Sequence, residues 1–406
     1  MANIAILIDF CEGHIFPTFR IAKGLRARGH NVCYLGVPDT ADVVRAQGFD
    51  FIDVFSDVMP EGSAQRLRMQ VGQDFGNQKL MNVSQNLYFG PLVCGDTVSR
   101  ALARLQPDVM LVLSFFTAEA LAIRYRYGIP VVMLTPNVRA QSRAEACRAV
   151  IEQVLDLKSG AVELLEYIRK SGAELRSLAD LGSLILSMPE LTLLPQGFEM
   201  PHRPKDPHTH YIGAGVDLDR VEQPFQWERI DSTRPIIYVC LGTQVWAYGE
   251  TARRFFRLLI EAASLKPQWQ FIISTGRNLD RAISGSVADH IYICDWAPQL
   301  AILARANLMV THGGMGAVKE CILTGIPMLV LPLMHDQFEC ASRVVHHELG
   351  LQADITTITP VALAALMEQL VMQESFRRHV YNMRETFLRG ENMPLAIQVV
   401  EQAAAH

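Results

Sequence analysis

The amino-acid sequence predicts an α/β protein built on doubly wound parallel sheets, and three observations carry this prediction. Short apolar runs bounded by turn residues alternate with longer helical patterns along the chain, as expected for buried parallel strands covered by helices. The alternation stops between Pro195 and Pro235, where prolines, glycines and polar residues accumulate, and then starts again. The chain has 406 residues, which is enough for two or three domains of ordinary size. We therefore expect two domains of the same class.

The first half is expected to form one parallel sheet. Its predicted strands are residues 4–8, 31–36, 109–113, 131–134 and 191–194. A helix is expected from about Phe19 to Arg28, because Gly29 is the kind of residue that ends many helices in the left-handed conformation. Residues 144–186 are predicted to form an inserted helical lobe, since their apolar positions recur at helical spacing.

The second half repeats the pattern, with predicted strands at residues 236–241, 270–274, 291–294, 308–311 and 328–332. We expect an N-terminal domain over residues 1–215, a linker over 216–233 and a C-terminal domain over 234–385. Ligands of such sheets bind beyond the carboxyl ends of the strands. The cleft between two facing sheets is therefore the default site.

Composition argues against several classes of protein. Half of the residues are hydrophobic, 19% are charged, and the net charge is −5 with no long basic run, which indicates packed cores and no nucleic-acid partner. The N-terminal apolar run stops at Asp9, too soon for a signal peptide. No apolar stretch reaches the ~20 residues of a transmembrane helix. The eight cysteines are scattered without CxxC pairs, so we expect reduced thiols in a cytoplasmic protein.

A glycine cluster after a predicted strand is the sharpest local signal. Gly313, Gly314 and Gly316 follow His312 and lead into a helical pattern. Glycines let backbone N–H groups approach a phosphate, and a helix N-terminus favours its negative charge. The same glycines could instead solve only a packing problem in a tight turn. The neighbouring segments decide between these interpretations.

Those segments carry groups that suit a nucleotide sugar. Trp296 and Gln299 follow the preceding predicted strand and offer an aromatic face and an amide. Glu320 lies about one turn beyond the glycines, where a carboxylate can accept hydrogen bonds from a ribose diol. Asp336 and Gln337 follow the next strand and suit sugar hydroxyls, although an acidic residue is also common in the first turn of a helix. Three successive strand ends therefore predict a nucleotide-sugar pocket.

The segment from Trp296 to Gln337, WAPQLAILARANLMVTHGGMGAVKECILTGIPMLVLPLMHDQ, resembles the donor-binding signature of family 1 glycosyltransferases. These enzymes use UDP-sugars to modify small lipophilic molecules. The HGG form of the motif is similar to that of bacterial members, which include macrolide and carotenoid glucosyltransferases. The resemblance implies the GT-B fold, in which two Rossmann-like domains face each other across a cleft. It also implies a C-terminal helix, here within residues 386–406, that returns to the first domain.

The resemblance assigns roles in binding the nucleoside. Trp296 would stack on uracil, and the backbone of Ala297 would read the edge of the base. Gln299 would lie near the ribose, and Glu320 would hold the ribose hydroxyls.

It also assigns residues to the diphosphate and the sugar. The diphosphate would be surrounded by His312, Gly314, Gly316 and Ala317 and covered from the other side by Gly242 and Thr243. Asp336 and Gln337 would hold the sugar hydroxyls, and glutamine at this last position indicates glucose.

The first domain carries the expected catalytic base. The sequence GHIFP, which contains His14, matches a loop of the same family, and His14 would take the proton of the acceptor hydroxyl. Family members usually have an aspartate near residue 113 that orients the histidine, whereas this chain has Leu113 and Ser114. Ser114 could orient the ring, but a hydroxyl cannot offset the charge of an imidazolium. Asp9 and Glu119 are possible substitutes that only geometry can judge.

The acceptor is expected to be small and lipophilic. Methionine and aromatic residues gather between Phe51 and Pro91, and this region with the helical lobe is the expected acceptor wall. Such residues at helical spacing are more often core than pocket. The candidates are Met59, Met69, Phe75, Leu80, Met81, Tyr88 and Phe89.

The sequence thus predicts an inverting transferase that moves a sugar from UDP to an acceptor hydroxyl. We expect no metal or other cofactor, and a monomer or homodimer. The missing aspartate leaves open a non-catalytic binding protein of the same fold, and a dTDP-deoxysugar donor or a lipid acceptor also stays open. A nicotinamide enzyme is disfavoured, because no GxGxxG opens either half.

Overall fold

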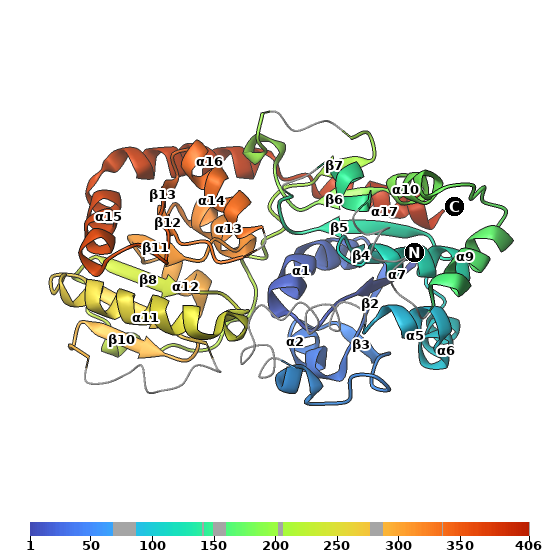
Figure 1. Cartoon of the computed structure of the whole chain (residues 1–406), viewed down its shortest axis with the longest axis horizontal. Coiled ribbons are helices and arrows are strands. Elements are labelled where there is room, and N and C mark those ends of the chain that lie inside the picture. The colour runs from blue at the N-terminus through green and yellow to red at the C-terminus, as the bar shows by residue number, and fades with distance from the viewer. Residues whose placement is uncertain are drawn as a thin grey trace.

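The structure is a computed structural model that describes residues 1–67, 87–139, 142–148, 160–201, 206–276, 287–334 and 336–405. Two parallel sheets, each covered by helices, form two lobes that lie side by side (Figure 1). The predicted class, with two Rossmann-like domains, is confirmed.

The first sheet has seven strands in the order β3-β2-β1-β4-β5-β6-β7. Two of them, β3 and β7, were not predicted, because DFID and THY are short and lack a continuous apolar run. The strands are β1 (Asn3–Leu7), β2 (Asn31–Gly36), β3 (Asp50–Asp53), β4 (Val109–Leu113), β5 (Val131–Thr135), β6 (Glu190–Thr192) and β7 (Thr209–Tyr211).

The second sheet has six strands in the order β10-β9-β8-β11-β12-β13. The five predicted strands are present, and the short edge strand β13 was missed. The strands are β8 (Ile236–Cys240), β9 (Gln270–Ser274), β10 (Ile291–Cys294), β11 (Leu308–Thr311), β12 (Met328–Val330) and β13 (Gly350–Gln352).

Each sheet reverses its strand order once. The reversal falls between β1 and β4 in the first sheet and between β8 and β11 in the second. In doubly wound sheets, ligands bind at this switch point, outside the carboxyl ends of the strands. We therefore expect the ligands to bind at the segments that follow these four strands.

The first helix, α1 (Glu12–Ala27), begins well before the predicted start at Phe19. The expectation was wrong because Pro17 is tolerated inside the helix, whereas proline is usual only at the first helical position. His14 consequently lies in the first turn of α1 and not in a loop. The other helices of this domain are α2 (Ala41–Ala46), α5 (Phe89–Cys94), α6 (Asp96–Leu105), α7 (Thr117–Arg126), α9 (Ala161–Lys170) and α10 (Leu178–Leu186).

The last helix, α17 (Met393–Ala404), lies in the first domain although it follows the second (Figure 1). It packs against α1, β4 and β5, and its apolar residues belong to the core of that domain. The helices before it are α11 (Gly249–Ser264), α12 (Gln299–Leu303), α13 (Met315–Thr324), α14 (Gln337–His346), α15 (Pro360–Met372) and α16 (Glu374–Arg389). Short 3-10 helices are η1 (Pro38–Thr40), η2 (Gln196–Phe198), η3 (Trp227–Arg229) and η4 (Val245–Tyr248).

Buried polar contacts join the two domains. The Lys319 ammonium of α13 donates to the carbonyl of Pro136, which follows β5, at 3.0 Å. Burial lowers the pKa of Lys319 to about 7. The guanidinium of Arg343 on α14 contacts the carboxylate of Glu199, which follows η2, at 2.5 Å.

The expected acceptor wall is only partly described. Met59, Tyr88 and Phe89 are 1–2% exposed and belong to the core of the first domain, so for these three candidates the core interpretation holds. Met69, Phe75, Leu80 and Met81 lie outside the described residues. Among the residues that the structure does describe, no helix has the length and apolarity needed to cross a membrane.

Candidate functional site

A histidine and a carboxylate meet at the carboxyl end of β1. His14 Nδ1 lies 2.7 Å from Asp9 Oδ2, and the side chains are 32% and 10% exposed. The other carboxylate oxygen of Asp9 accepts a hydrogen bond from the backbone N–H of Cys11 at 3.0 Å. The turn between strand and helix therefore holds the carboxylate against the ring.

This pairing sets the proton chemistry of His14. Burial alone lowers the pKa of His14, but the charge of Asp9 and its hydrogen bond raise the pKa well above its ordinary value. In the neutral ring, a hydrogen bond to the carboxylate places the proton on Nδ1 and leaves Nε2 as an acceptor. The geometry is that of a general base with an orienting carboxylate.

Neither Ser114 nor Glu119 partners His14. The ring nitrogens of His14 face Asp9 and Gln244, and the Ser114 backbone bonds to Leu134 and Thr117. The proposed catalytic role of Ser114 therefore has no support in the geometry. Glu119 is buried in α7, and burial raises its pKa to about 8, so it lacks the negative charge an imidazolium needs near pH 7.

An exposed aromatic ring lies beside the histidine. The ring centroids of Phe115 and His14 are 4.7 Å apart, and Phe115 is 40% exposed. Phe115 in turn packs against Phe116. Sequence reasoning missed this residue, although two consecutive phenylalanines just beyond a buried strand were a usable signal.

Segments from the two domains meet at His14. Its Nε2 atom lies 3.4 Å from the side-chain amide nitrogen of Gln244, which follows β8. A Cβ atom on Gly13 would lie 2.9 Å from the Thr243 hydroxyl, so a larger residue at position 13 would require the Thr243 side chain to shift. The segment that contains the predicted residues Gly242 and Thr243 therefore lies against the helical turn that carries His14.

His312 is packed between two glycines. A Cβ atom on Gly242, whose φ is +74°, would lie 2.5 Å from His312 Cε1, and one on Gly314 would lie 2.5 Å from Nε2. Both glycines thus allow close packing around His312, in agreement with the interpretation of the glycine cluster as a tight turn. Burial lowers the pKa of His312 to about 4, so the ring is a neutral hydrogen-bonding group.

Gly316 differs from these glycines. It lies with Ala317 in the first turn of α13, and a Cβ atom on Gly316 would meet nothing within 4 Å. The open space therefore adjoins the N–H groups at the start of a ten-residue helix, where an anion is favoured.

The two residues predicted to lie at the ribose, Gln299 and Glu320, are in contact. Gln299 Nε2 donates to Glu320 Oε2 at 2.9 Å, and Glu320 is 5% exposed. Ala297 is buried in the core of the second domain, whereas Trp296 is partly exposed. An unpredicted residue joins them, because Arg220 makes two hydrogen bonds to the Glu320 carboxylate.

Most of the hydrogen-bonding capacity of the Gln337 side chain is used within the protein. Its carbonyl oxygen accepts from the N–H groups of Leu333 and Met334 at 2.8 and 3.0 Å, and its amide donates to Tyr248 at 2.9 Å. One amide hydrogen remains for a ligand. Asp336 precedes it as the N-cap residue of α14.

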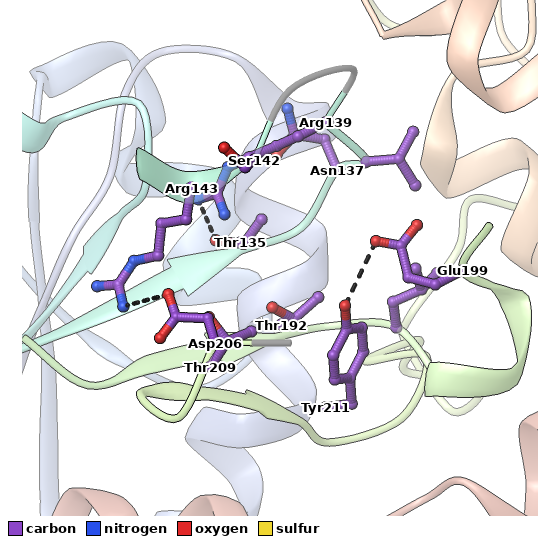
Figure 2. Close-up of a pocket in the computed structure, with 12 residues that line it drawn as sticks. Thr135, Asn137, Arg139, Ser142, Arg143, Thr192, Glu199, Asp206, Thr209 and Tyr211 are labelled. Carbon is purple, nitrogen blue, oxygen red and sulfur yellow. Dashed lines mark hydrogen bonds and ion pairs between the residues drawn. The ribbon is translucent and has the colours of Figure 1, made fainter. Parts of the chain in front are cut away.

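A separate pocket opens at the carboxyl ends of β5, β6 and β7, and Figure 2 shows the residues that line it. Its charged groups are paired within the protein: Arg143 contacts Asp206 at 3.3 Å, and Tyr211 donates to Glu199 at 3.4 Å. None of the predicted site residues lines this pocket.

One group of three potential metal ligands occurs among the described residues. The ligand atoms of Asp9, Cys11 and His14 lie within 4.8 Å of one another. Two of the three are the hydrogen-bonded pair at the end of β1, which accounts for their approach. The absence of a metal requirement stays a prediction.

Comparison with known proteins agrees with this architecture. The fold is that of GT-B glycosyltransferases: the glycotransferase of kitacinnamycin superposes with a TM-score of 0.76 at 25% identity and covers 99% of both chains. The model of the UDP-glucoronosyl and UDP-glucosyl transferase family matches residues 183–389. The chain therefore belongs to the UDP-glucoronosyl and UDP-glucosyl transferase family.

Curated relatives extend over nearly the whole chain. Oleandomycin glycosyltransferase of Streptomyces antibioticus is 28% identical and covers 88% of this chain and 80% of its own length. Zeaxanthin glucosyltransferase of Pantoea ananas is 22% identical and covers 99% of this chain and 96% of its own length. The expected resemblance to macrolide and carotenoid enzymes is confirmed.

Proposed function

We propose that this protein is an inverting glycosyltransferase that moves a sugar, glucose by preference, from UDP to a hydroxyl of a small lipophilic acceptor. The observation that carries the proposal is the His14–Asp9 pair, held 2.7 Å apart and facing Gln244 of the other domain. The first switch point supplies a base for the acceptor, and the second supplies an anion site for the donor diphosphate. This arrangement suits transfer of a sugar between two ligands that bind side by side.

The chemistry requires one proton transfer and one displacement. His14 Nε2 takes the proton of the acceptor hydroxyl while the oxygen attacks the anomeric carbon from the side opposite the diphosphate. The bond from carbon to the diphosphate oxygen breaks, and the configuration at the carbon inverts. Asp9 stabilises the imidazolium that forms, since its carboxylate is hydrogen-bonded to the His14 ring.

The donor occupies the second domain in this proposal. Trp296 and Ala297 hold the base, and Gln299 and Glu320 hold the ribose. The charge that develops on the diphosphate is stabilised by backbone N–H groups at the start of α13 together with the neutral His312. No step requires a metal ion. The sugar hydroxyls meet Asp336 and the remaining amide hydrogen of Gln337.

The acceptor lies against Phe115 in this proposal. Its exposed ring contacts His14, so an apolar molecule that covers Phe115 would bring a hydroxyl to the base. Burying such a surface stabilises binding by about 25 cal/mol per Å². The relatives named for oleandomycin and zeaxanthin support a natural-product acceptor.

The test is a panel of lipophilic hydroxylated compounds incubated with UDP-glucose. UDP release and the mass of the product are followed with and without EDTA, and the anomeric configuration of the product is assigned by NMR. We expect a glucoside of inverted configuration at a rate that EDTA leaves unchanged. UDP binding without product from any acceptor would favour the non-catalytic alternative, and a rate restored by magnesium after EDTA would contradict the metal-free mechanism.

A further inference from the structure

Arg220 is hydrogen-bonded to the carboxylate of Glu320, which the proposed function assigns to the ribose. It lies in the segment between the two sheets, and its guanidinium donates from Nη1 to Glu320 Oε1 and from Nη2 to Oε2, the latter at 3.2 Å. The side chains of Arg220 and Glu320 are only 10% and 7% exposed. A ligand that reaches Glu320 therefore meets a paired carboxylate.

Other contacts hold Arg220 in this place. Its Nη2 also donates to Glu222 at 2.9 Å, and Glu222 accepts from the N–H groups of Leu300 and Ala301 in α12. The guanidinium also lies 5.3 Å from the ring centroid of Phe16 on α1. Moving Arg220 away would leave the buried Glu320 carboxylate and the partly buried Glu222 carboxylate without their cation, at a high cost. The nucleotide is therefore expected to bind with Arg220 in place.

The acceptor capacity of Glu320 can then be counted. A carboxylate has about four lone-pair positions, two on each oxygen. Arg220 fills one on each oxygen, and Gln299 fills the second on Oε2. One position is left, and it lies on Oε1.

We infer that Arg220 determines nucleotide specificity by limiting Glu320 to a single sugar hydroxyl, so that the site accepts both ribose and 2′-deoxyribose nucleoside diphosphates. This inference rests on the proposed function, which places the nucleotide at Glu320. Ribose offers two neighbouring hydroxyls, but one acceptor position takes only one of them. A 2′-deoxyribose keeps the 3′-hydroxyl, which can fill the same position.

The test begins with the unaltered protein. Isothermal titration measures the dissociation constants of UDP, 2′-deoxy-UDP and 2′,3′-dideoxy-UDP, which share one base and one diphosphate. We expect UDP and 2′-deoxy-UDP to differ by at most about threefold, and the dideoxy compound to bind roughly tenfold more weakly or worse, as for a lost hydrogen bond to a charged group. A preference of more than tenfold for UDP over 2′-deoxy-UDP overturns the inference.

A substitution then tests Arg220 itself. Arg220→Met keeps an unbranched side chain over Phe16 and releases two positions on Glu320, so the ratio of the two dissociation constants should rise to about tenfold in favour of ribose. Arg220→Lys, which keeps a cation, should fall between this variant and the unaltered protein and serves if the methionine variant fails to fold. The matched control is Arg234→Met, which breaks an exposed pair with Asp231 in the same segment and should leave the ratio unchanged.

The outcomes separate the two proposals. If none of the three nucleotides binds, the proposed function fails. If UDP binds and neither Arg220 variant changes the ratio, the proposed function stands and the role of Arg220 is refuted.

Discussion

The two switch points of this molecule follow the pattern of their family to different degrees. At the second, every position of the donor motif is filled by the expected residue, from Trp296 to Gln337. At the first, the histidine is kept, but its carboxylate comes from the end of β1 instead of the end of β4. β1 and β4 are hydrogen-bonded neighbours, so a carboxylate at the end of either strand borders the same histidine. The comparison teaches that the carboxylate partner of a histidine can move to a neighbouring strand while the pair keeps its place in the fold.

The largest effect is expected from His14→Ala, which removes the base from the first switch point only. Loss of a general base lowers the rate by roughly 10²- to 10⁴-fold. UDP affinity should stay within about twofold, because no donor contact is lost. Steady-state kinetics and titration with UDP check both expectations, with His208→Ala as a control at an exposed histidine. Unchanged turnover would remove His14 from the mechanism.

A smaller loss is expected from Asp9→Asn, roughly 10- to 100-fold, because it removes an orienting group and not the base. Asp9 raises the pKa of His14, so its loss lowers that pKa. The histidine then becomes neutral at lower pH, and the acidic limb of the profile of kcat/KM against pH should move toward lower pH.

The matched control is Ser114→Ala, next to Leu113, the position where the family pattern puts the aspartate. We expect neither its rate nor its pH profile to change. A shift in the serine variant as large as in the asparagine variant would return the orienting role to β4 and break the comparison.

The contrast also explains what could be predicted from the sequence. The proposed donor site depends on residues that follow successive strands of one sheet, because each lies after a strand or within the first two turns of the helix that comes next. Gln299 and Glu320 were therefore assigned correctly to one group, as their 2.9 Å hydrogen bond shows. The ten predicted strands were found for the same reason, since continuous apolar runs mark buried parallel strands.

Contacts made in three dimensions could not be predicted in this way. The choice of Asp9 over Ser114 or Glu119 depends on how the turn after β1 folds back. Arg220 is separated from Glu320 by a hundred positions, and nothing in its local sequence marks it. β3, β7 and β13 lack the apolar runs that identify a strand, and their neighbours in the sheet determine their conformation.

The next expected effect is that of Glu320→Ala, at the second switch point. Losing one hydrogen bond to a charged group should weaken UDP binding by about 1.5 to 3 kcal/mol. The pH profile of transfer at saturating donor should stay unchanged, because the base is intact. Titration with UDP measures the loss, thermal melting checks the fold, and Glu250→Ala, at an exposed carboxylate on α11, is the control. UDP affinity equal to that of the unaltered protein would remove Glu320 from the ribose site.

The smallest effect is expected from Gly316→Ala. Comparing it with Gly314→Ala distinguishes a glycine needed for ligand binding from one needed for packing. The added methyl group meets nothing within 4 Å, and alanine favours a helix over glycine by about 0.5 to 1 kcal/mol, so the melting temperature should stay the same or rise. UDP affinity should fall, because the methyl group enters the space proposed for the diphosphate. Gly314→Ala should instead lower the melting temperature, since its Cβ atom would lie 2.5 Å from His312 and such overpacking costs about 1 to 3 kcal/mol of stability. If the Gly316 variant binds UDP normally, the diphosphate does not lie against the first turn of α13, and the glycines of the motif serve packing alone.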